Sequence, residues 1–417
     1  MKRIPRLDLT RLRQVRLAGT PWPRRAATAL VVLLLLCVAY VAGAYTDQQF
    51  PEVIPVIGGG QSRAQLDEPA QQQALRIIEA HYWTEHVDGT ALTDGSIQGM
   101  VQALNDPFTS YLTPAQYREE QESYAGQHSQ EVGVFLDYTG ANPVVTGIIP
   151  DSPAQRAGME AGDAVLAVNG RSTSGVDAST VGSWIDRSGA RVSLLLQRGA
   201  QQLTVPVAPA RFSSPSVVST KLSSDILYMR VYEFGDTTAQ EFTQQLRAGL
   251  PAKGIILDLR GNGGGYVSAA VAVVSSFVAK GEVFSTQGRG QTQRTNVSGN
   301  VIAPSTPLTV LVDQNTASAS EITSGSLMVH DRATLVGERT YGKGSEQEDF
   351  PLSNGGDLHL TVRHWYLPNG KWIGDHRGIQ PNRVVALPQP WDMYDVATPQ
   401  RSGAQDTQLQ AALTMLP

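Results

Sequence analysis

Two short stretches of this 417-residue chain combine residue types that could carry out nucleophilic chemistry. The first, residues 315–322, reads Asn-Thr-Ala-Ser-Ala-Ser-Glu-Ile, and the second, residues 341–347, reads Tyr-Gly-Lys-Gly-Ser-Glu-Gln. A serine hydroxyl becomes a strong nucleophile only when a base removes its proton. A lysine can be that base when burial lowers its pKa from about 10.4 toward roughly 7–8. Ser318 and Lys343 are therefore candidates for a serine–lysine pair that performs acyl transfer.

The segments around these residues predict how they are positioned. Residues 308–312, Leu-Thr-Val-Leu-Val, have the length and β-branched content of a buried strand. The apolar residues after Ser318 recur at helical spacing, so a helix is expected to begin there. Its first N–H groups have no intrahelical partner and lie at the positive end of the helix dipole, which stabilises an oxyanion. A further strand, residues 333–337, would return the chain toward Lys343.

Three motifs resemble those of the C-terminal processing peptidases, also called tail-specific proteases. They are Ser-Ala-Ser-Glu-Ile at residues 318–322, Gly-Lys-Gly-Ser-x-Gln at residues 342–347, and Asp-Leu-Arg-Gly-Asn-Gly-Gly-Gly at residues 258–265. The resemblance implies a serine-type endopeptidase with a crotonase/Clp-like α/β core. Within the glycine-rich motif, Asp258 and Arg260 are expected to brace the loop rather than to react.

Carried over position by position, the resemblance implies a role for each of five residues. Ser318 would be the nucleophile, Lys343 the general base, and Gln347 the group that orients the lysine. The backbone N–H groups of Gly264 and Ala319 would form the oxyanion hole.

Residues 119–212 are predicted to form a separate β-rich module. Five short strands are expected in it, at residues 132–136, 144–149, 164–168, 192–196 and 203–207. The segment from Asp151 to Gly158 and the Ala-Gly-Asp at residues 161–163 resemble a PDZ domain. Such a domain adds an extended peptide to its sheet edge and captures the terminal carboxylate of the peptide on backbone N–H groups.

The resemblance implies a peptide-binding loop that contains Val132, Gly133 and Val134. A helix at residues 177–187 would face this loop. Glu131 stands where such loops commonly have glycine, and its carboxylate would weaken the binding of an anion. Two roles for this module therefore remain open: it captures the terminal carboxylate of a peptide, or it serves mainly in packing or gating. Arg187 would either link peptide binding to the active site or lie at the helix end as a solvated charge.

Two other interpretations of the candidate reactive residues compete with the serine–lysine pair. In a Ser-His-Asp hydrolase, His330 or His364 would replace Lys343 as the base. In a non-catalytic protein, a degenerate peptidase core with a PDZ domain would hold peptide tails without cutting them. No Gly-x-Ser-x-Gly elbow accompanies the seven histidines, whereas Ser318, Lys343 and Gln347 are all present, which favours the serine–lysine enzyme.

The predicted fold class is α/β (α+β) and multidomain. Residues 213–390 alternate strands and helices, which predicts an α/β layer with functional loops beyond the strand ends. The resemblance makes this segment the peptidase core, with the PDZ domain inserted ahead of it. Residues 71–118 have helical periodicity and would form a helical N-terminal portion. Residues 391–417 are a tail whose apolar end, residues 409–416, is either a docking helix or disordered.

The N-terminal residues predict a membrane anchor. Residues 1–25 carry eight basic side chains and one acidic side chain, and residues 26–46 are long and apolar enough to cross a membrane. By the positive-inside rule the N-terminus would stay in the cytoplasm. The expectation is a single-pass helix in the bacterial cytoplasmic (inner) membrane, followed by a linker, residues 47–70, and an extracytoplasmic catalytic domain. A cleaved signal peptide is the alternative, although its apolar region is normally shorter.

The remaining chain is acidic, with 25 basic and 37 acidic side chains and a net charge of −12, which argues against nucleic-acid binding. One cysteine and no His-Glu-x-x-His pattern give no indication of a protein-bound metal, and no cofactor is expected. The implied function is a membrane-anchored serine endopeptidase that recognises and cleaves the C-terminal region of exported proteins through a Ser-Lys(-Gln) mechanism. Its partners would be protein substrates with accessible C-terminal tails. Because such proteases often self-associate, a homo-oligomer is also open.

Overall fold

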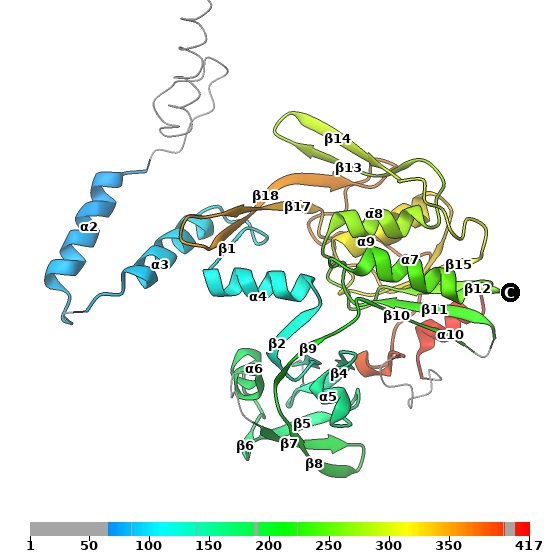
Figure 1. Ribbon diagram of the computed structural model, residues 1–417, viewed down its shortest axis with the longest axis horizontal. Helices are drawn as coiled ribbons and strands as arrows, with labels where there is room; N and C mark the ends of the chain where they lie inside the picture. Colours follow the sequence, from blue (N-terminus) through cyan, green and yellow to red (C-terminus); the bar gives the residue numbers. More distant parts are fainter. Residues whose placement is uncertain are drawn as a thin grey trace, which may run out of the picture. The chain divides into compact units, whose positions relative to one another are not determined.

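The computed structural model describes residues 66–84, 86–138, 140–186, 191–222, 224–394, 396 and 405–417 (Figure 1). The chain divides into two compact units, residues 1–87 and 88–417. In the first unit the described residues form one helix, α2 (Glu68–His81). Asp67 caps this helix by accepting a hydrogen bond from the N–H of Ala70 (3.1 Å), and no residue of α2 is buried.

The predicted transmembrane segment, residues 26–46, lies outside the described residues. Among the residues that are described, no helix is both long and apolar enough to span a membrane. The anchor therefore stays a prediction from the sequence.

A six-stranded sheet forms the centre of the second unit. Its strands follow the order β10 (Val217–Lys221), β11 (Ile226–Val231), β12 (Gly254–Asp258), β15 (Leu308–Val312), β16 (Thr334–Gly337) and β19 (Arg383–Val384). The strands from β11 to β19 are parallel, and β10 is antiparallel to β11. Every residue of β11, β12 and β15 is buried, which is why their sequences are continuously apolar. The strands predicted at residues 308–312 and 333–337 are confirmed.

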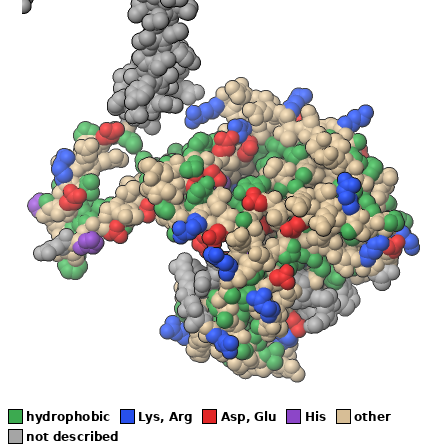
Figure 2. All heavy atoms as spheres, in the orientation of Figure 1, with side chains coloured by type: hydrophobic (Ala, Val, Ile, Leu, Met, Phe, Trp, Pro, Cys, Tyr) green, Lys and Arg blue, Asp and Glu red, His purple; other side chains and the backbone are tan. Residues whose placement is uncertain are grey.

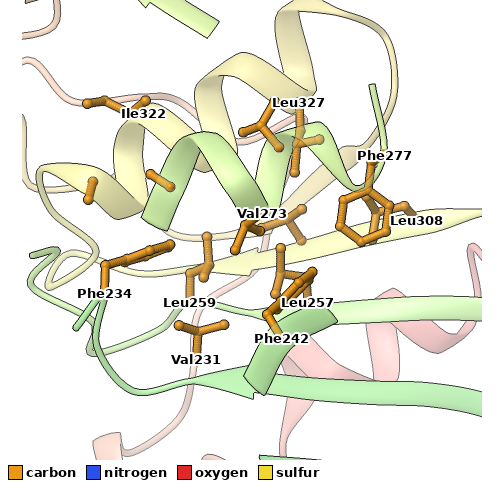
Figure 3. Packing of buried hydrophobic residues seen from close by; sticks show 14 of the residues in the cluster. Val231, Phe234, Phe242, Leu257, Leu259, Val273, Phe277, Leu308, Ile322 and Leu327 are labelled. Atoms are coloured by element: carbon orange, nitrogen blue, oxygen red, sulfur yellow. The ribbon is translucent and has the colours of Figure 1, made fainter. Parts of the chain in front are cut away.

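Helices cover both faces of this sheet (Figure 1). They are α7 (Thr238–Gly249), α8 (Val267–Ser275) and α9 (Ala319–Val329) on one face, and α10 (Thr407–Leu413) on the other. Figure 3 shows Phe242, Val273 and Leu327 from the first three helices in one core with Leu257. Leu409 of α10 is buried against the opposite face. The apolar end of the chain is therefore a docking helix and not a disordered tail.

A second sheet brings distant parts of the chain together. Its strands are β1 (Ser110–Leu112), β13 (Glu282–Gly288), β14 (Gln291–Asn296), β17 (Ser345–Pro351) and β18 (Asp357–Tyr366). The long strand β18 pairs with β1, β13 and β17. The sequences of β14 and β17 are mostly polar and do not alternate with apolar residues, so they carry no strand signal of their own. Their pairing with neighbouring strands determines their conformation.

Two helices flank β1 in the sequence. α3 (Gly89–Gln102) begins at Asp88, whose carboxylate accepts hydrogen bonds from two N–H groups of the first turn. α4 (Pro114–Tyr124) begins with a capping box formed by Thr113 and Gln116. The helical N-terminal portion predicted from periodicity is therefore present, with its second and third helices in the second unit.

The β-rich module has its own sheet and core. It contains β3 (Val134–Asp137), β4 (Val144–Ile148), α5 (Pro153–Arg156), β5 (Ala164–Val168), β6 (Arg171–Ser172), α6 (Ala178–Asp186), β7 (Val192–Arg198) and β8 (Gln201–Val207). The sheet order is β3-β4-β5-β7-β8, with β6 beside β5. Val145, Val165 and Leu194 are fully buried in its core. β2 (Gln127–Glu131) and β9 (Ala210–Ser213) pair where the chain enters and leaves the module. The five predicted strands are confirmed.

A buried ionic network fixes the loop after β12. The guanidinium of Arg260 donates from Nε to Asp258 Oδ1 (2.9 Å), from Nη1 to Asp406 Oδ1 (2.9 Å) and from Nη2 to Asp406 Oδ2 (2.8 Å). The two carboxylates compensate the buried positive charge. Asp258 and Arg260 therefore brace the loop as expected, and Asp406 connects it to α10. On the surface, by contrast, acidic and basic side chains are interspersed over the face shown in Figure 2.

Candidate active site

Ser318 lies between β15 and α9 with an unusual backbone conformation. It is the N-cap residue of α9, with φ 55° and ψ −118°. Residues with a side chain rarely adopt this combination, which costs on the order of 1–3 kcal/mol and persists only where surrounding contacts enforce it. Such a sharp turn at the start of a helix is typical of a serine whose hydroxyl must be presented to a substrate.

The loop before Ser318 is tied to the loop after β12. Both carboxylate oxygens of Asp313 accept from the N–H of Gly261 (3.0 and 3.1 Å). The hydroxyl of Thr316 contacts Asp313 and the carbonyl of Leu259, both at 3.0 Å. These bonds join the ends of two adjacent parallel strands, so the glycine-rich loop and the serine occupy one edge of the sheet.

Glu321 connects the two segments that carry the predicted nucleophile and base. Its Oε2 accepts from the backbone N–H of Ser318 (3.0 Å) and of Lys343 (2.9 Å). Its Oε1 accepts from the N–H of Gly342 (2.7 Å) and from the hydroxyl of Thr340. Burial raises the pKa of Glu321, and these four donors oppose the rise. The sequence marks Glu321 only as a favourable residue in the first helical turn; its link to Lys343 appears only in the structure.

We expect Glu321→Gln to lower kcat about 100-fold, because a glutamine would turn an N–H₂ group toward backbone donors and displace Ser318 from Lys343. The unfolding free energy should fall by about 1–3 kcal/mol, since at least one buried donor loses its acceptor. Peptide hydrolysis and denaturant unfolding measure the two effects. Glu338→Gln is the matched control, because it removes a half-buried carboxylate from the loop between β16 and Lys343, and it should change kcat less than threefold. If both variants lose the same activity, Glu321 has no specific positioning role.

Lys343 is packed into a narrow space. A Cβ on Gly342 would lie 2.7 Å from the N of Gly378, and one on Gly344 would lie 2.4 Å from Nε1 of Trp372. Only glycine fits at both positions, which explains the Gly-Lys-Gly sequence. The Lys343 Nζ lies 5.5 Å from the centre of the Phe108 ring.

Burial lowers the pKa of Lys343, while the negative charges of Glu120, Asp106 and Glu321 oppose the change. A lower pKa increases the neutral fraction of the amine, as a general base requires. Phe108 and Asp106 lie in the loop between α3 and β1. Glu120 comes from α4. Their proximity to the lysine depends on the pairing of β1 with β18, which the sequence did not reveal.

The charge of Glu120 gives a testable pH dependence. A lysine that acts as general base must be neutral, so with Lys343 in that predicted role kcat/KM should rise with pH through its pKa. Glu120→Gln removes a charge that raises this pKa, and the acid limb of the profile should therefore move to lower pH. Glu119→Gln removes an exposed carboxylate from the same helix and should leave the limb unchanged. Profiles of kcat/KM recorded with a chelator present measure the shift. An unchanged limb in Glu120→Gln would show that another group sets it.

The structure does not join the predicted catalytic side chains directly. Among the described residues, no hydrogen bond connects the Ser318 hydroxyl with the Lys343 amine, or Gln347 with Lys343. Gln347 Nε2 instead donates to the hydroxyls of Ser345 (2.8 Å) and Thr361 (3.0 Å). The roles of all three residues therefore remain predictions, and the structure places Glu321, and not Gln347, in hydrogen-bond contact with Lys343 itself.

The two predicted oxyanion donors differ in their surroundings. The N–H of Ala319 begins α9 and has no acceptor within the described part of the chain. Gly264 lies beside the serine, since a Cβ on it would be 2.7 Å from the Ser318 Cβ and 2.9 Å from the Ala319 N. Its N–H, however, donates to Asn262 Oδ1 (2.8 Å). Gly264 has φ +109°. One donor is therefore available, and the other must leave Asn262 before it can face an oxyanion.

His330 and His364, the two histidines considered as alternative bases, contact other groups. His330 Nε2 is 2.7 Å from the carbonyl oxygen of Glu282. The ring of His364 stacks on Trp372, with 4.9 Å between ring centres. Within the described residues, neither imidazole is hydrogen-bonded to Ser318. A lysine base is therefore favoured by the sequence motifs and by the lowered pKa of Lys343, and not by a contact with Ser318.

The predicted peptide-binding loop lies at the start of β3. Val132 is fully buried, Gly133 has φ +81°, and Val134 begins the strand. β3 stands at the end of the strand order, so its outer edge is where an added peptide strand would pair. The carboxylate of Glu131 is 3.2 Å from the His128 Nδ1. Arg187 lies outside the described residues, and its role stays a prediction.

A cavity of about 630 Å³ lies elsewhere, between the β-rich module and the loops that follow β12 and β15. Phe135 and Tyr138 line one side, and Asn315 lines the other. Neither Ser318 nor Lys343 contributes to its wall. The cavity is therefore not the place where the predicted nucleophile would meet a substrate.

Comparison with known proteins agrees with this architecture. Residues 225–385 match the family model of Peptidase family S41, residues 144–198 match a PDZ domain, and residues 59–115 match the N-terminal domain of the activating protease CtpB. The solved structure of a photosystem II D1 C-terminal processing protease is similar, with a TM-score of 0.54 and 26% identity. The match covers 82% of this chain and 99% of that one. Fold and site together define a serine peptidase with an α/β core and a PDZ domain.

Similar proteins show to which family of serine peptidases the chain belongs. The carboxy-terminal-processing protease of Bartonella bacilliformis is 32% identical over 74% of this chain and 73% of its own length. The carboxy-terminal processing protease CtpA of Bacillus subtilis is 29% identical over 82% of this chain and 75% of its own length. The chain belongs to the carboxy-terminal processing protease family. The family resemblance predicted from its motifs is confirmed.

Proposed function

We propose that this protein is a membrane-anchored serine endopeptidase that recognises and cleaves the C-terminal region of exported protein substrates. Family membership supports C-terminal processing. The basic residues 1–25 and the apolar residues 26–46 support a single-pass anchor in the bacterial cytoplasmic membrane, with the catalytic domain on the extracytoplasmic side.

In the proposed mechanism, Ser318 Oγ attacks the carbonyl carbon of the scissile peptide bond while Lys343 Nζ takes the hydroxyl proton. The Ala319 N–H stabilises the resulting oxyanion, together with the Gly264 N–H once it has turned from Asn262. When the tetrahedral intermediate collapses, the C–N bond breaks and Lys343 returns the proton to the leaving amine. Water then attacks the acyl-enzyme while Lys343 takes its proton. When the ester C–O bond breaks, Lys343 returns this proton to Ser318 Oγ and the product carboxylate leaves.

The observation that carries this proposal is the bridge formed by Glu321. Its carboxylate holds the backbone N–H groups of Ser318 and Lys343, at 3.0 and 2.9 Å. The two residues come from different segments, α9 and the loop before β17, and a buried charge shared between them fixes both segments relative to each other. A hydroxyl and a lysine of lowered pKa on adjoining segments supply the parts of a serine–lysine pair.

The PDZ domain supports selection of C-terminal tails. The outer edge of β3, which pairs with no other strand among the described residues, fits an added strand, and the turn at Gly133 precedes it directly. Gly133 must be glycine, because a Cβ there would lie 2.3 Å from the Ser152 Cβ. A substrate tail bound on this edge would deliver the preceding segment of an unfolded polypeptide to the peptidase core.

The test compares one unfolded polypeptide with a free C-terminus and the same polypeptide with an amidated C-terminus, both incubated with the full-length chain. Mass spectrometry of the products gives the cleavage sites. We expect cuts near the C-terminus and at least about tenfold faster hydrolysis of the free-acid substrate, which corresponds to about 1.4 kcal/mol of carboxylate recognition. Equal rates for both substrates would contradict recognition of the tail, and absence of any cleavage would contradict the peptidase.

A further inference from the structure

Three metal-ligating side chains meet on one face of the β17–β18 hairpin. Asp349 on β17 pairs directly with His359 on β18, and Asp357 lies two residues before His359 on the same strand. Side chains two residues apart on a strand point to the same face. One ligand atom from each of the three residues lies within 4.8 Å of the others. The Nδ1 of His359 is 2.6 Å from Oδ1 of Asp349.

A second observation distinguishes this cluster from ordinary surface acids. Asp357 is fully buried, with 0% of its surface exposed, and in the part of the chain that the structure describes neither of its carboxylate oxygens makes a hydrogen bond of normal geometry; the backbone N–H of Phe350 acts on it electrostatically. A buried carboxylate without partners is costly, and native proteins rarely contain one without a compensating group. Asp357 therefore lacks a counter-ion that its position requires.

The neighbouring helix adds negative charge to the same place. Glu120 of α4 interacts electrostatically with Asp349, Asp357 and His359, and its Oε2 is buried without a partner among the described residues. Three carboxylates thus face one imidazole, and the amine of Lys343 acts on Glu120 as well. No Lys or Arg is among the charged groups that act on Asp357, which are Asp349 and His359. The local charge balance favours a bound cation.

We propose that Asp349, Asp357 and His359 bind a divalent transition-metal ion of the Zn²⁺ class. Two carboxylate oxygens and one imidazole nitrogen are three ligands that Zn²⁺ accepts, and the exposed side of Asp349 leaves room for water as a fourth. The imidazole favours such an ion over Mg²⁺ or Ca²⁺, which prefer sets made only of oxygen ligands. No local spacing in the sequence indicates this site, because its ligands are brought together by strand pairing.

A bound ion would stabilise the β17–β18 hairpin, which follows the predicted base Lys343. β17 begins two residues after Lys343, and β18 pairs with it along its whole length. An ion held across the two strands would lock their register near Asp349. This effect does not depend on the proposed peptidase mechanism, so zinc binding and catalysis can be tested separately.

The experiment uses the full-length chain in detergent, freed of metal with a chelator and then dialysed against buffered Zn²⁺. Mass spectrometry of the metal content gives zinc bound per chain, and thermal unfolding gives the shift in Tm. We expect one zinc per chain, a higher Tm with zinc, and at least about tenfold weaker binding in both Asp357→Asn and His359→Gln. Mg²⁺ at the same concentration should not raise Tm.

Glu348→Gln is the matched control, since Glu348 is next to Asp349 on β17 but contacts Arg363 instead. It should bind zinc as the wild type does. The proposal fails if the wild type binds no stoichiometric zinc, because the buried carboxylate would then be neutral. It also fails if Asp357→Asn and His359→Gln bind zinc with wild-type affinity. The Tm measured in the presence of chelator shows whether each variant is folded. Because the two variants change different ligands, a folding defect in one of them leaves the other to test the proposal.

Discussion

Ser318→Ala should lower kcat about 10⁴- to 10⁶-fold, because loss of the attacking oxygen leaves only the contribution of substrate binding and the oxyanion site. The variant should remain folded, since alanine keeps the Cβ and the backbone strain at φ 55° is unchanged. Hydrolysis of an unfolded polypeptide measures the loss of activity. A fluorophosphonate probe, which reacts with activated serines, should label the wild type with one equivalent per chain and should not label the variant.

Ser320→Ala is the matched control for this experiment. Ser320 is in the same motif, is fully buried, and its hydroxyl has no hydrogen-bond partner among the described residues. Its removal should leave both labelling and hydrolysis near the wild-type level. If the wild type neither reacts with the probe nor cleaves any unfolded polypeptide, the protein is a tail-binding adaptor on a degenerate core. Labelling that persists in Ser318→Ala would assign the nucleophile to another serine.

Lys343→Ala should lower kcat about 10²- to 10⁴-fold, the range expected for loss of a positioned general base. Lys343→Arg should be equally inactive although it keeps the charge and most of the length, because a guanidinium does not lose its proton in a protein. This pair of variants separates proton transfer from simple electrostatic attraction. Steady-state hydrolysis measured across a pH range gives the result, since the wild-type rate should fall as Lys343 becomes protonated.

Lys371→Ala controls for the loss of a lysine in general, since Lys371 is exposed in a turn after β18. It should keep the wild-type rate. Near-normal hydrolysis by Lys343→Ala would point to a histidine base, and His330→Ala and His364→Ala would then identify which one. If Lys343→Arg hydrolysed the substrate at the wild-type rate while Lys343→Ala was inactive, the site would require a positive charge and not proton transfer.

Local patterns were sufficient to predict much of the fold. β11, β12 and β15 are buried on both faces, so their sequences are continuously apolar and each could be recognised without knowledge of its neighbours. The strands of the PDZ domain are short apolar segments between turn residues, and they were predicted in the same way. β14 and β17 were missed because their polar residues become strands only through pairing with β13 and β18.

In the candidate site, too, some features follow from local sequence patterns and others depend on tertiary contacts. Ser318 at a helix start, Lys343 between glycines and the glycine-rich loop are local features, so the sequence by itself determined which residues carry the proposed chemistry and which family the chain resembles. Only the tertiary structure decided what surrounds them. Glu321 bridges two segments, Phe108 reaches Lys343 from far along the chain, and the Gly264 N–H points to Asn262. These contacts depend on strand register and peptide orientation, which no local pattern specifies.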